Sequence, residues 1–298
     1  MPPDEPSADR HAPVGVPLVA MCGHLLRRAQ QHHTAVWAQE VGEELTGPQY
    51  AVLAALEMWP GADQRQVGTL ASLDRTSTAE VVRRLEARGW LTRDVDPQDA
   101  RRDVLALAPD AALQRVHQRV RSVQVRLLEP LPSHDRAPFV QDLAVIARID
   151  ENSAPPRSEG SPLRIPGHLL RRAQQVHTDL FAETLGREVT GPQYAAMHVL
   201  VEHPDISQVE LGDRTALDRS TTADLVARLE RRGWLVRERD PKDGRRRVLA
   251  LTFEGSQVAA AGTPMVLAVQ NDLLSPLPTK RRAAFLRRLG VVARVTGG

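Results

Sequence analysis

One stretch of sequence occurs twice in the chain and decides its organisation. LDRTSTAEVVRRLEARGWL at residues 73–91 returns as LDRSTTADLVARLERRGWL at residues 217–235, 144 positions later. Two further pairs keep the same offset, namely TGPQYA at 46–51 and 190–195, and GHLLRRAQQ at 23–31 and 167–175. About half of the positions in 46–107 are identical to those in 190–251 without a gap, which is more than shared helical patterning produces. The chain is therefore an internal duplication.

The repeat sets the expected domain organisation. A length of 298 residues accommodates two domains of common size. Between the copies, DENSAPPRSEGSP at 150–162 is polar and proline-rich without an apolar period, so it is predicted to be a linker with a reach of about 40 Å. We therefore expect a disordered tail at 1–16, one domain at 17–149 and a second at 163–298.

The composition of the chain and the capping and helix-ending residues of each copy predict a mainly helical fold with short strands. Hydrophobic residues make up 42% of the chain and aromatic residues only 3%. Within the first copy we predict a long helix ended by Gly42, a helix from the cap Thr46 to Trp59, and a short helix at 63–71. The prediction continues with a helix capped by Asp74 that buries Ala79, Val82 and Leu85, strands at 90–93 and 104–107, and helices at 109–129 and 133–148.

A short helix, a turn, a capped helix and an arginine-rich hairpin together suit DNA binding. The capped helix can read the major groove while the hairpin contacts the flanking backbone. Arginine is the better bidentate partner for phosphate and guanine, and all but two of the Lys and Arg residues are Arg. On the two capped helices, the residues expected to contact DNA are Arg75, Thr76, Ser77, Arg83, Arg84, Arg219, Ser220, Thr221 and Arg228.

The run from LDR through RLE and RGWL to DPxDxRR resembles the winged helix-turn-helix of the MarR family, and the resemblance covers both copies nearly end to end. It implies an α+β winged helix-turn-helix fold in two MarR-like domains. By resemblance, Arg101 and Arg245 are wing arginines that enter the minor groove, where a narrow groove concentrates negative potential. Ion pairs with Asp99 and Asp243 would orient them. The neighbouring wing residues expected to contact DNA are Arg102, Arg246 and Arg247.

The two copies differ in charge. Residues 73–103 hold seven Arg and seven Asp or Glu, whereas residues 217–247 hold ten Lys or Arg and six Asp or Glu. Asp103 stands where the second copy has Arg247. Because phosphate attraction scales with the cations presented, the second copy is predicted to supply more of it. We expect Arg245→Ala to cost more DNA affinity than Arg101→Ala.

The MarR resemblance also implies how the two copies act together. MarR-type proteins are homodimers that pair through their first and last helices, so a short linker would produce an intrachain pseudo-dimer. Two recognition helices about 34 Å apart would then read half-sites on one duplex face. We therefore expect a monomeric chain that binds a double-stranded DNA operator, which can be an imperfect palindrome because the halves differ.

The family resemblance further implies a repressor whose DNA binding is relieved by a small aromatic or anionic compound. A cation and a neutral donor in a partly apolar cleft suit an aromatic carboxylate. The alternative is that the same residues line the interface between the copies and bind nothing. The candidate ligand-binding residues on the two first helices are His24, Arg28, Gln31, His33, Trp37, His168, Arg172, Gln175, His177 and Phe181.

Other classes of function are less well supported by the sequence. No Ser/His/Asp elbow, phosphate-binding glycine loop or dinucleotide fingerprint is present, so we expect neither an enzyme nor a cofactor. His24, His32 and His33 are too loosely clustered for zinc, and the single Cys22 is more simply a buried thiol than a redox switch. No apolar stretch is long enough for a membrane span, so a cytoplasmic protein is expected. A tandem winged-helix protein-interaction module and a regulator without a ligand stay as alternatives.

Overall fold

A computed structural model gives the architecture of most of the chain. The described residues are 16–96, 99, 103–109, 113–149, 163–186, 188–240, 243–244 and 246–294. The predicted linker at 150–162 falls outside them, and so does the predicted tail at 1–16 except for its last residue. Arg101, Arg102 and Arg245, the central wing arginines, also lie outside the described residues.

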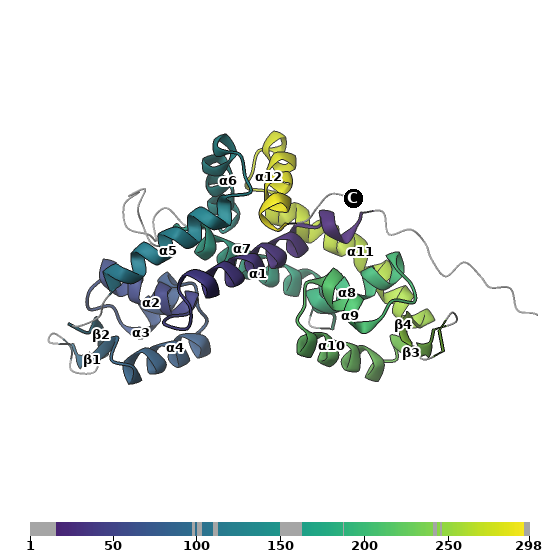
Figure 1. Cartoon of the computed structure of the whole chain (residues 1–298), viewed down its shortest axis with the longest axis horizontal. Helices are drawn as coiled ribbons and strands as arrows, with labels where there is room; N and C mark the ends of the chain where they lie inside the picture. The colour runs from purple at the N-terminus through teal and green to yellow at the C-terminus, as the bar shows by residue number, and fades with distance from the viewer. Residues whose placement is uncertain are drawn as a thin grey trace, which may run out of the picture. The chain divides into compact units, whose positions relative to one another are not determined.

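The first copy folds in the predicted order (Figure 1). Its elements are a 3₁₀ turn η1 (Leu18–Ala20), α1 (Cys22–Glu40), α2 (Gly47–Met58), α3 (Gln64–Leu70), α4 (Arg75–Ala87), β1 (Leu91–Val95), β2 (Asp103–Leu107), α5 (Leu113–Leu128) and α6 (Ser133–Ile146). The two strands form an antiparallel hairpin in which Leu91 pairs with Leu107 and Val95 with Asp103. The hairpin is therefore longer than the predicted strands at 90–93 and 104–107.

The second copy repeats this order with a longer fifth helix. Its elements are α7 (Pro166–Leu185), α8 (Gly191–Glu202), α9 (Gln208–Thr215), α10 (Arg219–Arg231), β3 (Leu235–Arg239), β4 (Arg247–Leu251), α11 (Phe253–Leu274) and α12 (Thr279–Val292). Each hairpin is tied to the loop before its third helix, because Leu105 N donates to Ala62 O (3.0 Å) and Leu249 N donates to Ile206 O (2.9 Å). The mainly helical, winged helix-turn-helix fold in two tandem copies is confirmed.

The chain divides into two compact units, and neither contains one copy alone. The unit that we call the first-repeat unit consists of residues 29–174 together with 287–294. The second-repeat unit consists of residues 16–28 together with 175–286. Each unit thus includes the start of the other copy's first helix. The domain limits 17–149 and 163–298 follow the duplication and stay a prediction from the sequence.

Side-chain caps explain where α2 and α4 begin. Thr46 Oγ1 accepts from Gln49 N, and the Gln49 side chain accepts from Thr46 N (2.8 Å), which completes a capping box. Asp74 Oδ1 accepts from Ser77 N (2.9 Å) at the start of α4. Beyond the end of α4, Gly89 adopts a φ of +70°, a left-handed conformation that favours glycine. The predicted caps at Thr46 and Asp74 are confirmed.

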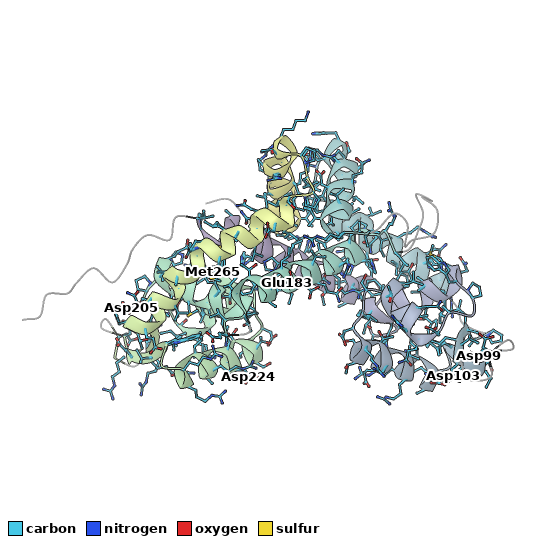
Figure 2. All side chains as sticks on the ribbon, turned by 180° about the vertical axis from the view of Figure 1, so that it is seen from behind. Asp99, Asp103, Glu183, Asp205, Asp224 and Met265 are labelled. Atoms are coloured by element: carbon cyan, nitrogen blue, oxygen red, sulfur yellow. The ribbon has the colours of Figure 1, made fainter. Side chains whose placement is uncertain are left out.

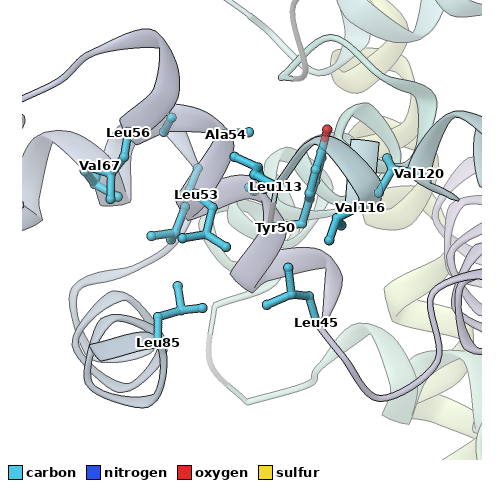
Figure 3. Packing of buried hydrophobic residues seen from close by; sticks show 14 of the residues in the cluster. Leu45, Tyr50, Leu53, Ala54, Leu56, Val67, Leu85, Leu113, Val116 and Val120 are labelled. Atoms are coloured by element: carbon cyan, nitrogen blue, oxygen red, sulfur yellow. The ribbon is translucent and has the colours of Figure 1, made fainter. Parts of the chain in front are cut away.

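The core of the first-repeat unit is built around α2, which is buried on nearly all sides (Figure 3). Leu53 and Leu56 of α2 are buried together with Val67 of α3, Leu85 of α4 and Val116 of α5. Complete burial of such a side chain contributes about 1.5–3 kcal/mol. The position of α4 relative to α2 and α5 is thus fixed by apolar contacts.

One predicted core position on α4 is wrong. Ala79 is exposed, and Thr78 is buried in its place with 2% of its surface accessible. The Thr78 hydroxyl donates to Asp74 O (2.7 Å), so its polar group is satisfied inside the first turn. Its methyl group packs at Gly68 of α3, where an added Cβ would lie 3.0 Å from it. Val82 and Leu85 are buried as predicted.

Candidate nucleic-acid interface and buried pocket

The first turn of each recognition helix, α4 and α10, is exposed to solvent. Arg75 and Arg219 are exposed at the first helical position. The hydroxyls of Ser77 and Thr221, in contrast, donate to the capping carboxylates of Asp74 (2.5 Å) and Asp218 (2.6 Å). Ser220 also donates to Asp218 (3.0 Å), and the exposed Thr76 completes the first turn of α4. The arginines, together with Thr76 on α4, are therefore the outward-directed donors of these turns.

The hydroxyl and backbone donors at the caps also set the charge of the two aspartates. Hydrogen bonds from the Thr221 hydroxyl and backbone lower the pKa of Asp218 to about 2. Those from Ser77 lower the pKa of Asp74. Both caps are thus ionised at neutral pH. A negative charge at a helix N-terminus stabilises the helix dipole.

The outer faces of the two recognition helices differ. On α4, Glu80 pairs with Arg83 (3.1 Å) and Arg84 (2.6 Å), and these arginines lower the pKa of its carboxyl group. On α10, the counterpart of Glu80 is the shorter Asp224, which Figure 2 labels. Arg228 is exposed and forms no ion pair with any carboxylate of the described residues. The second copy therefore presents an uncompensated guanidinium where the first copy presents compensated ones.

The two hairpins also differ in charge, and the hairpin of the second copy is the more basic one. At the turn end of the second hairpin, Arg239 and Arg247 are directly opposite each other, so two cations share one cross-strand position. The corresponding position of the first hairpin holds Val95 and Asp103, and Asp103 lies 3.7 Å from Arg93. Figure 2 labels Asp99 and Asp103 at this end of the first hairpin. Like charges opposite each other are destabilising unless an anion is bound between them.

Two other wing residues are described. Asp243 is exposed, and its backbone N donates to Asp240 Oδ1 (3.4 Å) inside the hairpin turn. Arg246 pairs with Glu210 of α9 at 2.9 Å, so this arginine connects the wing to the first helix of the helix-turn-helix.

A cavity of about 230 Å³ lies inside the first-repeat unit. Its walls come from the second half of α1, the start of α2 and the first turns of α7, and include His33, Trp37, Tyr50, His168 and Arg171. The Trp37 and Tyr50 rings are 5.9 Å apart, and the Trp37 indole N–H donates to Leu45 O (2.6 Å). The cavity is thus lined in part by aromatic rings and has one arginine among its lining residues.

Arg171 connects this cavity to the helix-turn-helix. Its guanidinium donates to Ala71 O (2.7 Å) and to Ser72 O (2.9 Å). Both carbonyls lie in the turn between α3 and the recognition helix α4. His168 adds a second link, because its Nε2 is 3.2 Å from Ser72 Oγ. Burial lowers the pKa of Arg171 to about 10, which leaves it charged at neutral pH.

The second-repeat unit contains the matching arrangement, but its cavity is only about 30 Å³. Arg27 takes the place of Arg171 and donates to Thr215 O (3.2 Å), which precedes the turn before α10. Leu18 and Met21, which precede α1, contribute to the lining. The other residues of this smaller cavity include Gly23, His24, His177, Phe181, Tyr194, Val266 and Gln270.

Comparison with known proteins identifies the family. Models of the MarR family match residues 45–102 and 188–246. HosA, a transcriptional regulator of Escherichia coli O111:H-, is 37% identical over 120 residues, which cover 40% of this chain and 88% of HosA. The chain belongs to the MarR family. NicR, an HTH-type transcriptional repressor of Pseudomonas putida, is 32% identical over 121 residues that cover 40% of this chain and 77% of NicR.

Solved structures include a relative of one half of the chain. The PcaV transcriptional regulator of Streptomyces coelicolor, crystallised in complex with its natural ligand, is 42% identical. The match covers 44% of this chain and 92% of PcaV, with a TM-score of 0.41. The two family matches and the regulators HosA and NicR, rather than this structure, make the chain a DNA-binding transcriptional regulator with two MarR units in tandem.

The predicted ligand residues of this MarR protein fall into three groups. His33, Trp37 and His168 line the larger cavity, and His24, His177 and Phe181 line the smaller one. The remaining four, Arg28, Gln31, Arg172 and Gln175, are not among the lining residues of either cavity. Arg28 instead donates to Asp213 O (3.3 Å).

The arginines that do line the cavities, Arg27 and Arg171, were missed from the sequence. The repeated Arg-Arg pairs at 27–28 and 171–172 were the available signal, but the choice within each pair was off by one residue.

The four histidines at the cavities are neutral at pH 7. Burial, and then the neighbouring arginine charges, lower the pKa of His24 and His168 to about 3 and that of His33 and His177 to about 4. Cys22 is also buried, and burial raises the pKa of its thiol to about 12. Within the part of the chain that the structure describes, no group of three His, Cys, Asp or Glu side chains is placed to hold a metal ion, and no helix is long and apolar enough to cross a membrane.

Proposed function

We propose that this regulator is a repressor that binds one operator with both of its winged helices and that a small aromatic anion in the larger cavity releases it. The observation that carries this proposal is the position of Arg171, whose guanidinium lines the cavity and also holds the turn before α4. The repressor NicR, which is 32% identical over 121 residues, supports the direction of regulation.

The composition of the two compact units supports an intrachain pseudo-dimer. Arg171 of the second copy satisfies the carbonyls of Ala71 and Ser72 of the first copy, within the first-repeat unit. In the second-repeat unit, Cys22 N of the first copy donates to Gln270 of the second (2.8 Å). A copy alone would leave these buried polar groups unpaired, at a cost of about 1–3 kcal/mol each.

The operator-contacting surface is proposed to be unequal between the halves. Arg75 and Arg219 are the donors of the two first turns, and Arg228 and Arg247 add uncompensated charge in the second copy. The wing arginines Arg101, Arg102 and Arg245 are assigned to the DNA by their position in the MarR pattern. An operator with two unequal half-sites about one helical turn apart fits this asymmetry.

The cavity indicates the class of effector. A volume of about 230 Å³ is below the usual range for drug-sized ligands, so a compound with a single ring is the right size. Trp37 and Tyr50 offer ring faces, and Arg171 offers the cation for a carboxylate or phenolate. An anion that attracts Arg171 competes with the carbonyls of Ala71 and Ser72, and this competition would loosen the turn that positions α4.

The volume of the smaller cavity supports unequal use of the two matching sites. About 30 Å³ is enough for one or two water molecules and excludes an aromatic acid. We therefore propose one effector molecule per chain, bound in the first-repeat unit.

The test combines DNA binding with effector titration. Fluorescence anisotropy on duplexes from the upstream region of the protein's own gene, at several salt concentrations, is compared with a scrambled duplex. Substituted benzoates are then added to the complex, and calorimetry counts the bound molecules. We expect a sequence preference, release by at least one acid, and a stoichiometry of one.

A matched pair of variants assigns the site. An added Cβ at Gly167 would lie 2.0 Å from the His33 ring, and one at Gly23 would lie 2.2 Å from the His177 ring. Gly167→Ala should therefore abolish the effector response, whereas Gly23→Ala makes a similar local disturbance at the smaller cavity and should leave the response intact. Absence of any sequence preference would favour a protein-interaction module. DNA binding that no acid alters would favour a regulator without a ligand.

A further inference from the structure

The last helices of the two copies, α6 and α12, share their apolar positions. From residue 127 on, the second copy runs 146 positions behind the first, so Phe139 corresponds to Phe285 and Leu143 to Leu289. All four are fully buried. One arginine also keeps its role in both helices, because Arg136 Nε donates to Leu131 O and the corresponding Arg282 Nε donates to Leu277 O, each at 3.0 Å.

The charged positions of the same helices have diverged. Asp135 and Asp142 of α6 correspond to Arg281 and Arg288 of α12, and Gln141 corresponds to Arg287. As a result, α6 holds two aspartates and one arginine, whereas α12 holds five Lys or Arg residues and no acidic residue. The divergence is thus from acidic to basic at corresponding positions.

Within the first-repeat unit these diverged positions meet. Arg288 Nε is 2.7 Å from Asp135 Oδ1, and Arg288 Nη1 is 3.6 Å from Asp142 Oδ2. Asp142 has no solvent-accessible surface, and the Arg288 side chain is only 21% exposed. Removing a carboxylate from water is costly unless a cation compensates it, and here the cation comes from the other copy.

We propose that the opposite charges at these corresponding positions make the pairing of the last helices selective. The acidic α6 surface pairs with the basic α12 surface and not with a second α6. If α6 occupied the place of α12, a carboxylate would stand where Arg288 stands and would face Asp135 and Asp142. Two α12 helices would bring Arg288 against a second Arg288. Like-charge contacts of this kind discriminate against the wrong partner.

The partner is therefore the second copy of the same chain. This inference rests on the proposed pseudo-dimer. It says why α6 does not pair with a second α6 or α12 with a second α12, and it does not depend on DNA or effector binding.

The first test measures the coupling between the two charges in the full chain. Thermal unfolding is compared for Asp142→Asn, Arg288→Gln and the double variant, with Arg287→Gln as the control, because Arg287 is exposed on the same helix. Arg288→Gln removes the cation that faces both carboxylates and should lower Tm by roughly 10 °C, whereas the control should change Tm by less than about 2 °C. The double variant should be no less stable than Arg288→Gln. Additive losses would overturn the proposal.

The second test measures selectivity. A protease site within residues 150–162 allows the folded chain to be cut between the copies. Isotopically labelled and unlabelled cut samples are mixed, and native mass spectrometry records the pairs after exchange. We expect only pairs of a first with a second copy. Like pairs at the statistical share of one half would overturn the proposal even if the protein binds its operator normally, so this failure is separate from a failure of the proposed function.

Discussion

Replacing Arg171 by methionine should uncouple the cavity from the recognition helix. Methionine keeps an unbranched apolar stem but cannot donate to Ala71 O and Ser72 O, which now receive bonds of 2.7 and 2.9 Å. Bonds from a charged donor contribute about 1.5–3 kcal/mol each. The variant no longer has to bury a guanidinium, which offsets part of that loss. We expect a net destabilisation of about 2–3 kcal/mol.

The matched control is Arg27→Met in the second-repeat unit. Arg27 donates a bond of 3.2 Å to Thr215 O, beside the cavity of about 30 Å³. This variant should lose only about 1 kcal/mol and should keep the effector response. Urea unfolding gives the stabilities, and anisotropy with and without the aromatic acid gives the responses. A normal effector response in Arg171→Met, or equal behaviour of the two variants, would refute the reasoning.

Two further predictions concern the DNA-binding face and the effect of pH. Glu80→Gln should free Arg83 and Arg84, so the salt slope of DNA binding should steepen by about 0.9 for each new phosphate contact and affinity near 0.15 M salt should rise about fivefold per contact. Asp224→Asn, the control on α10, should leave the slope unchanged, and equal slopes for the two variants would contradict the prediction. Lowering the pH from 6.5 towards 4 should reduce the free energy of unfolding, because the unfolded chain binds protons that the buried histidines do not. The slope should be at most about 1.4 kcal/mol per pH unit for each histidine. Urea midpoints at pH 7.5 and 5.5 test this prediction, and equal midpoints would exclude it. The four buried histidines concerned are His24, His33, His168 and His177.

Most of the fold could be predicted because its signals are local. Thr46 and Asp74 are caps whose side chains bond three residues ahead, and the sequence shows such short-range patterns directly. The repeat then transfers every assignment to the second copy. The error at Ala79 was one of helical phase, since the first turn of α4 buries a threonine whose hydroxyl is satisfied by the backbone.

The candidate site was harder to predict because its residues come from distant segments. Arg171 is paired with carbonyls about 100 residues earlier in the chain, and nothing in the local spacing separates it from Arg172. The difference in volume between the two cavities could not be predicted from the repeat either. Leu18 and Met21 line the smaller cavity but precede the first repeated segment, which begins at residue 23. An apolar helical face shows that a helix is covered but not which copy covers it.

The stoichiometry of the operator complex tests the central claim most directly. Sedimentation or mass photometry of the protein on its selected operator should give one chain of 32.9 kDa per duplex, with footprinting protection at two half-sites about one helical turn apart. Two chains per duplex, or protection of a single half-site by one chain, would contradict the account.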